Sequence, residues 1–305
     1  MGSEGPGARE DHTWTVAGDG ITAYLFGGRT DDGASDEMWE FDLVSESWSI
    51  GTVAGPGPDA RWGHTATWVP DVGLVVWSGQ SETGFFDDIW RFQPSVNAWQ
   101  QLPSLGAVPP ARYGSCASLG PDGRLWISHG FTDDSGRFAD TRAYDFGTGE
   151  WTDETPEGDL PVERCLHDCY WSAEGKLILY GGQTTGTGAL GDLWAFDPAN
   201  GWEQGPQSIA PARQLYAFAS AEGIGIFFGG GSVDGGFLDD TWIIGDRTLE
   251  VVEEPYVTRP PARAGATLIP AGRFRYLLFG GRDSDGPMAD LWELSGFFSQ
   301  APSAP

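Results

Sequence analysis

The chain has 305 residues, with 17 Lys+Arg against 44 Asp+Glu, a formal net charge of −27, and unusually many glycines (46), prolines (21) and tryptophans (15). No stretch approaches about 18 consecutive apolar residues and the N-terminus is charged, so the sequence predicts a soluble chain without a transmembrane helix or signal peptide. The negative charge and the single lysine, Lys176, argue against partners such as nucleic acids and anionic membranes.

Three cysteines are an odd number, which argues against a disulfide framework and favours a reducing compartment such as the cytoplasm. Secretion after removal of a leader remains an alternative. Cys165 and Cys169 are four positions apart on an expected strand, hence about 13 Å apart and too distant to bond. We expect the cysteines to be buried thiols.

Six times along the chain, an apolar run ends in a glycine pair or its equivalent. These pairs are Gly27-Gly28, Ser78-Gly79, His129-Gly130, Gly181-Gly182, Gly229-Gly230 and Gly280-Gly281. Their last residues are separated by 51, 51, 52, 48 and 51 positions. A fixed period of this length indicates a repeat architecture.

Each period carries further markers at fixed places. An acidic residue two positions before a tryptophan follows the glycine pair at Glu37/Trp39, Asp88/Trp90, Asp192/Trp194, Asp240/Trp242 and Asp290/Trp292. The third unit has Asp140 and Arg142 instead. A second tryptophan follows at Trp48, Trp99, Trp151 and Trp202, and each unit restarts at a Pro/Gly-rich turn that ends in arginine.

Each period also holds about four short apolar or alternating runs separated by Gly, Pro, Asp and Asn, which predicts four strands. Six such units predict an all-β, six-bladed β-propeller with four-stranded antiparallel blades around a central channel. The glycine pair and the two tryptophans resemble the kelch repeat, and the resemblance covers residues 9 to about 294.

The repeat markers set the expected boundaries. We expect a flexible segment at 1–8, one propeller at 9–298 and a flexible tail at 299–305. The predicted blades are 9–60, 61–111, 112–163, 164–212, 213–262 and 263–298. The last unit lacks a second tryptophan, so its blade is either three-stranded or closed by the segment 295–300.

In a propeller, the turn into each innermost strand and the loop after each second strand meet on one face around the channel, here called the channel-mouth face. The kelch adaptors of ubiquitin ligases, which this pattern resembles, use arginines at that face to hold acidic peptides. The predicted ligand-binding residues are Arg9, Arg61, Arg112, Arg164, Arg213, Arg263, Arg29, Arg282, Gln80, Gln183, Trp62, Tyr113 and Phe131. The alternative is that each repeat-start arginine ties its own loop to a neighbouring acidic residue.

Two residues of the third unit depart from the repeat, because His129 replaces a glycine and Arg142 replaces a tryptophan. With Glu163 and His167, His129 is a candidate for acid–base catalysis. His167 stands three positions after its arginine, as His12 and His64 do, so a structural role is the alternative.

The spacing of Asp159, Glu163 and His167 is similar to the iron motif of the nitrile-specifier proteins, which are kelch propellers, but the carboxylates are in the reverse order. Gly/Asp-rich loops such as 30–33 could coordinate calcium or be solvated turns. Iron and calcium are therefore secondary candidates, and the sequence implies no cofactor.

These features favour a binding module that recognises a protein, a peptide or an anionic ligand through the channel-mouth face. The alternative is an enzyme that acts on an anionic small molecule in the central funnel. The resemblance to sialic acid mutarotases and specifier proteins implies an isomerase or a lyase in that case. The sequence does not predict an oligomeric state.

Overall fold

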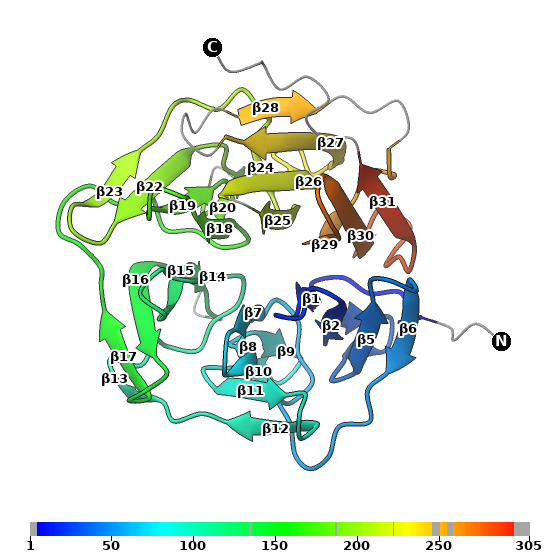
Figure 1. Cartoon of the computed structure of the whole chain (residues 1–305). Coiled ribbons are helices and arrows are strands. Elements are labelled where there is room, and N and C mark those ends of the chain that lie inside the picture. Colours follow the sequence, from blue (N-terminus) through cyan, green and yellow to red (C-terminus); the bar gives the residue numbers. More distant parts are fainter. Residues whose placement is uncertain are drawn as a thin grey trace.

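Six small antiparallel sheets stand in a ring around a central axis, and the first and last sheets lie side by side (Figure 1). The computed structural model describes residues 5–133, 136–186, 188–221, 223–245, 251–254 and 259–295, and these form only strands, turns and bridges. The prediction of an all-β, six-bladed propeller is confirmed. None of the described segments forms a helix that could cross a membrane.

The blades follow the chain in order, each beginning with its innermost strand. Blade one holds β1 (Thr13–Val16), β2 (Thr22–Phe26), β5 (Met38–Asp42) and β6 (Ser47–Ile50). Blade two holds β7 (Thr65–Val69), β8 (Gly73–Trp77), β11 (Ile89–Gln93) and β12 (Ala98–Gln101). Blade three holds β14 (Cys116–Leu119), β15 (Leu125–Phe131), β16 (Arg137–Asp145) and β17 (Glu150–Asp153), with β13 (Leu105–Gly106) parallel to β17.

The second half of the ring repeats this order. Blade four holds β18 (Asp168–Trp171), β19 (Leu177–Tyr180), β22 (Leu193–Asp197) and β23 (Gly201–Gln204). Blade five holds β25 (Ala217–Ala221), β26 (Ile224–Ser232), β27 (Phe237–Ile244) and β28 (Val251–Glu254), with β24 (Arg213–Gln214) beside β26. Blade six holds β29 (Ala264–Pro270), β30 (Arg275–Arg282) and β31 (Leu291–Ser295). Short hairpins are β3–β4 (Arg29–Thr30, Gly33–Ala34), β9–β10 (Gln80–Ser81, Gly84–Phe85) and β20–β21 (Gln183–Thr184, Gly188–Ala189).

The hydrophobic core lies between the blades. The second strands are apolar runs that are buried on both faces, as in β8 with the sequence GLVVW. Six hydrophobic clusters of buried residues each join neighbouring blades. Because no sheet can bury its faces alone, the ring is stabilised by contacts between consecutive repeats.

Among the described residues, no blade is shared between the two ends of the chain. Blade one has four strands of its own, and blade six has three strands among the described residues. Phe279 of blade six packs against Trp14 and Trp48 of blade one. Arg9 donates its N–H to the Met288 carbonyl at 3.0 Å and accepts from Gly281 at 2.9 Å. The expected closing segment 295–300 lies outside the described residues after Ser295.

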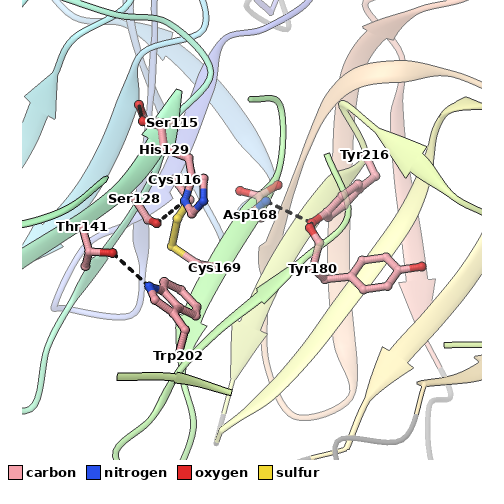
Figure 2. Close-up of a disulfide and its surroundings, with 10 residues drawn as sticks. All are labelled: Ser115, Cys116, Ser128, His129, Thr141, Asp168, Cys169, Tyr180, Trp202 and Tyr216. Atoms are coloured by element: carbon pink, nitrogen blue, oxygen red, sulfur yellow. Dashed lines mark hydrogen bonds between the residues drawn. A yellow bond between two sulfur atoms is a disulfide. The ribbon is translucent and has the colours of Figure 1, made fainter. Parts of the chain in front are cut away.

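A disulfide joins Cys116 of β14 to Cys169 of β18, across the interface between blades three and four (Figure 2). The expectation that these two cysteines are free thiols was wrong, whereas Cys165 is a buried free thiol as predicted. Consecutive innermost strands are neighbours in the ring. Cysteines 53 positions apart, about one repeat period, can therefore meet.

Candidate binding face and axial cavity

The six repeat-start arginines are buried inside the blades, with at most 1% of their surface exposed. Arg213 is typical: its guanidinium donates to both oxygens of Asp240 at 2.7 and 2.8 Å and to the Gly229 carbonyl at 2.9 Å. Its Nε donates to the Pro211 carbonyl at 3.1 Å. The other five arginine–acid pairs are Arg9–Glu37, Arg61–Asp88, Arg112–Asp140, Arg164–Asp192 and Arg263–Asp290.

The tryptophan two positions after each acid completes the same network. Trp242 Nε1 donates to Asp240 at 2.6 Å, and in blade three Arg142 Nε donates to Asp140 at 3.0 Å in the tryptophan's place. Burial acts to raise the pKa of Asp240, but hydrogen bonds from Arg213 and Trp242 and the guanidinium charge lower it overall. In blade three, Arg142 thus preserves the hydrogen bond to the acid that a tryptophan makes in the other blades.

This geometry corresponds to the alternative interpretation, in which each repeat-start arginine ties its loop to a neighbouring acid. A guanidinium that is buried and bound on three sides offers no accessible edge to a ligand. We therefore leave the six buried repeat-start arginines out of the proposed binding surface: Arg9, Arg61, Arg112, Arg164, Arg213 and Arg263.

The residue after each of these arginines does lie on the channel-mouth face, paired with the residue after the glycine pair. The backbone pairs are Glu10–Arg29, Trp62–Gln80, Tyr113–Phe131, Cys165–Gln183, Gln214–Gly231 and Ala264–Arg282. The structure thus brings together the other seven predicted ligand-binding residues: Arg29, Arg282, Gln80, Gln183, Trp62, Tyr113 and Phe131. Arg137 joins them, donating to Gln183 Oε1 at 3.2 Å.

Arg29 and Arg282 give one side of the mouth its positive charge. Arg29 is exposed and its guanidinium lies 5.5 Å from the centre of the Trp62 ring. No described residue accepts a hydrogen bond from this guanidinium, although the Arg29 backbone N–H donates to the Glu10 carbonyl at 2.8 Å. Arg282 is 40% exposed and contacts buried Glu10 at 3.1 Å. Burial raises the pKa of Glu10, while the charges of Arg282 and Arg29 act in the opposite direction.

Asp11 lies next to this pair on the channel axis. Burial and the nearby Glu10 raise the pKa of Asp11 to about 7, against the charges of Arg29 and Arg282 and a hydrogen bond with Tyr113. Asp11 also has a φ of 53°, in the left-handed region, where the equivalent residues of the other blades are three glycines and two leucines. Its position follows from a closed ring of backbone hydrogen bonds.

In that ring, Asp11 donates to Gly265, Gly265 to Leu215, Leu215 to Leu166, Leu166 to Gly114, Gly114 to Gly63 and Gly63 to Asp11, at 2.7–3.0 Å. A cavity of about 210 Å³ runs along the axis from this ring, lined by the innermost strands of all six blades. Its walls include Asp168, Tyr216, Phe218 and three histidines, His12, His64 and His167.

The catalytic candidates occupy different environments. His129 and His167 are buried between blades three and four with ring centres 5.5 Å apart, whereas Glu163 is exposed. Burial, with a smaller effect of Arg164, lowers the pKa of His129 to about 3. Burial and the neighbouring His129 and Arg164 also lower the pKa of His167. Both imidazoles are therefore neutral at pH 7 and cannot act as acids there.

The three predicted metal ligands also differ in burial, because Asp159 and Glu163 are exposed whereas His167 is buried. Within the described part of the chain, no three His, Cys, Asp or Glu side chains form a group that could hold a metal ion. Asp31 and Asp32 of the predicted calcium loop are exposed, which is typical of a solvated turn.

Sequence reasoning missed Glu10, Asp11, Arg137 and Asp168. A signal for Asp11 was present, because aligning the units on their arginines places it where the other units have glycine or leucine. The charge of Asp168 likewise interrupts an innermost strand that is otherwise apolar or hydroxylic in the aligned units.

Fold and site geometry together define a ring of kelch-type repeats with a polar channel mouth. The family model of the KLHDC2/KLHL20/DRC7 Kelch-repeats domain matches residues 1–174. The chain therefore belongs to the Kelch-repeat family.

The names of similar proteins indicate different functions. The chain is 29% identical to Kelch domain-containing protein 3 of Bos taurus over 210 residues, which are 64% of this chain and 53% of that protein. It is 28% identical to the N-(sulfonatooxy)prop-2-enimidothioate sulfolyase of Thlaspi arvense over 212 residues, 56% of this chain and 60% of that protein. It is 28% identical to the Rab9 effector protein with kelch motifs of Xenopus laevis over 161 residues, which are 50% of this chain and 44% of that protein. The chain spans about half the length of the Kelch domain-containing protein 3 sequences.

Proposed function

We propose that this chain is a protein-binding module whose channel-mouth face recognises carboxylate-bearing peptide segments of a partner. The observation that carries the proposal is Arg29, an exposed guanidinium above Trp62 with no hydrogen-bond acceptor among the described residues. A free guanidinium edge can hold a carboxylate through two parallel hydrogen bonds.

Neighbouring residues support a peptide as the ligand. Arg282 of blade six adds a second partly exposed guanidinium, and the rings of Phe85 and Phe131, on blades two and three, lie 5.9 Å apart. An aromatic surface beside a cationic edge suits an acidic residue followed by apolar ones. The Rab9 effector protein with kelch motifs is a relative whose name indicates a protein partner.

The test starts from a displayed peptide library selected on the whole chain, followed by fluorescence polarisation with one selected peptide. We expect affinity to fall at least tenfold in Arg29→Ala/Arg282→Ala, and equally when the peptide's carboxylates are replaced by amides. Arg273→Ala is the matched control, because Arg273 is exposed and its guanidinium lies 4.9 Å from the ring centre of Phe274 in the β29–β30 turn, away from the mouth. Equal losses in the two variants, or no loss in either, would contradict the proposal.

Asp11 favours a second candidate function, an enzyme acting on an anionic small molecule. A carboxyl group whose pKa is raised to about 7 beside two arginines is suited to proton transfer at neutral pH. The sulfolyase relative acts on a sulfonated substrate according to its name. If the chain is such an enzyme, Asp11→Asn abolishes turnover while the anion still binds; if binding is the whole function, that variant leaves peptide affinity within about twofold.

A further inference from the structure

Two carboxyl groups line the axial cavity: Asp11, which lies near the charges of Arg29 and Arg282, and Asp168, which has no counter-charge. Asp168 begins β18 and lines the cavity, and its carboxyl group has no hydrogen-bond or ion-pair partner among the described residues. The backbone N–H of Asp168 donates a hydrogen bond to the hydroxyl of Tyr216 on the neighbouring blade at 3.0 Å (Figure 2). Burial alone raises the pKa of Asp168 to about 7. Asp168 is half-buried, and its exposed surface belongs to a residue that lines the cavity. A carboxylate held away from bulk solvent without a partner is costly, and a bound cation would remove that cost.

No other residue of the cavity supplies the missing positive charge. Its lining includes neither arginine nor lysine. His12, His64 and His167 line it, but burial lowers the pKa of each imidazole, so all three are neutral at pH 7. His12 and His64 are also fixed by hydrogen bonds between their Nε2 atoms and the hydroxyls of Thr267 and Thr13 on the preceding blades.

The lining favours an organic cation over a metal ion. A metal ion needs several converging ligands, and the described residues contain no cluster of three acidic, histidine or cysteine side chains. Tyr216 and Phe218 line the wall next to Asp168, and aromatic rings attract ammonium groups. The volume of about 210 Å³ corresponds to about seven water molecules, which suits a small molecule.

We propose that the axial cavity binds a small organic ammonium ion, whose charge is neutralised by Asp168. This site is separate from the proposed peptide-binding surface, because the ring of backbone hydrogen bonds from Asp11 to Gly265 stands between the mouth residues and the cavity. The bound ion would lie between the carboxylate of β18 and the aromatic residues of blade five.

The proposal is tested by titrating choline into the whole protein at pH 8 in a calorimeter. The paired ligand is dimethylbutanol, in which carbon replaces the quaternary nitrogen and the shape is kept. We expect choline to bind, and the uncharged isostere to bind at least tenfold more weakly. Absence of choline binding, or equal affinity for both ligands, would overturn the proposal without the need for any variant.

Variants then locate the site. Asp168→Asn is expected to weaken choline binding at least tenfold, whereas Asp234→Asn, at an exposed turn, leaves it unchanged. Arg29→Ala/Arg282→Ala should bind choline as the wild type does, and Asp168→Asn should bind the selected peptide normally. An unchanged choline affinity in a folded Asp168→Asn variant would refute the assignment, independently of the outcome for the mouth.

Discussion

Replacing Asp240 by asparagine tests whether the repeat-start arginines are structural. In the native protein Asp240 accepts two hydrogen bonds from Arg213, at 2.7 and 2.8 Å, and one from Trp242 at 2.6 Å. The Arg213 side chain is fully buried and that of Asp240 is 14% exposed. Removing the negative charge leaves a buried guanidinium unpaired, which costs about 3–5 kcal/mol of unfolding free energy.

The measurement is equilibrium unfolding in urea, with midpoint and slope compared between variants. Glu293→Gln is the control, because its ion pair with Arg275 has side-chain exposures of 47% and 23% and should contribute less than about 1 kcal/mol. Glu37→Gln should fall between the two, since Glu37 is 44% exposed and contacts Arg9 through one oxygen. A loss below about 1 kcal/mol for Asp240→Asn would refute the reasoning and return the arginines to consideration as ligand-binding residues.

Three further predictions concern stability. Reducing the Cys116–Cys169 disulfide, or replacing both cysteines by alanine, should lower the unfolding free energy by up to about 4 kcal/mol, measured with and without reductant; an equal reductant effect on the double variant would contradict this. Asp168 has a pKa of about 7 when folded and about 3.8 when unfolded, so the native state retains its proton longer and wild-type stability falls between pH 4 and 7. The unfolding free energy of Asp168→Asn should therefore equal that of the wild type near pH 4 and exceed it by up to about 4 kcal/mol at pH 8. Equal urea midpoints for the two proteins at pH 8 would contradict the raised pKa of Asp168. Gly229→Ala should lower the unfolding free energy by more than about 2 kcal/mol, because φ is 65° and the new Cβ would lie 2.7 Å from the Arg263 carbonyl oxygen. Gly235→Ala, where φ is 78° and no atom lies near the new Cβ, should lower it by about 1 kcal/mol. Similar melting temperatures for the two variants would show that the close approach at Gly229 is absent.

The blade plan could be predicted from the sequence because its signals are local and repeated six times. A glycine pair, an acid, a tryptophan and an arginine recur in every unit or nearly so, and the four belong to one hydrogen-bond network that is centred on the arginine. Arg142 departs from the repeat pattern, but its Nε makes the same contact as a tryptophan Nε1. A substitution can therefore break the sequence pattern and keep the interaction.

Contacts between units were harder to predict. The Cys116–Cys169 bond joins neighbouring blades, and an odd cysteine count concealed it. His129 keeps the positive φ of the glycine that it replaces, at 58°, and its ring centre lies 5.5 Å from that of His167 on the next blade. Placing either feature requires knowledge of how the blades are rotated about the axis, which spacing along the chain does not give.

The sequence predicted which residues lie at the channel mouth, but not which of the predicted arginines are accessible there. The seven predicted residues that directly follow a repeat-start arginine or a glycine pair do lie at the backbone pairs around the channel mouth, as expected from propeller topology. Which arginines remain accessible depends on side-chain pairing inside the blade. The six arginines that looked most regular in sequence are the buried ones.

A crystal structure of the protein with a selected acidic peptide would test the central claim most directly. We predict a peptide carboxylate within hydrogen-bond distance of the guanidinium groups of Arg29 and Arg282, with an apolar side chain against Trp62 or Phe131. The six repeat-start arginines should keep their acidic partners in that complex. A peptide bound along the outer strands, or one whose carboxylate displaces Asp240 from Arg213, would contradict the account.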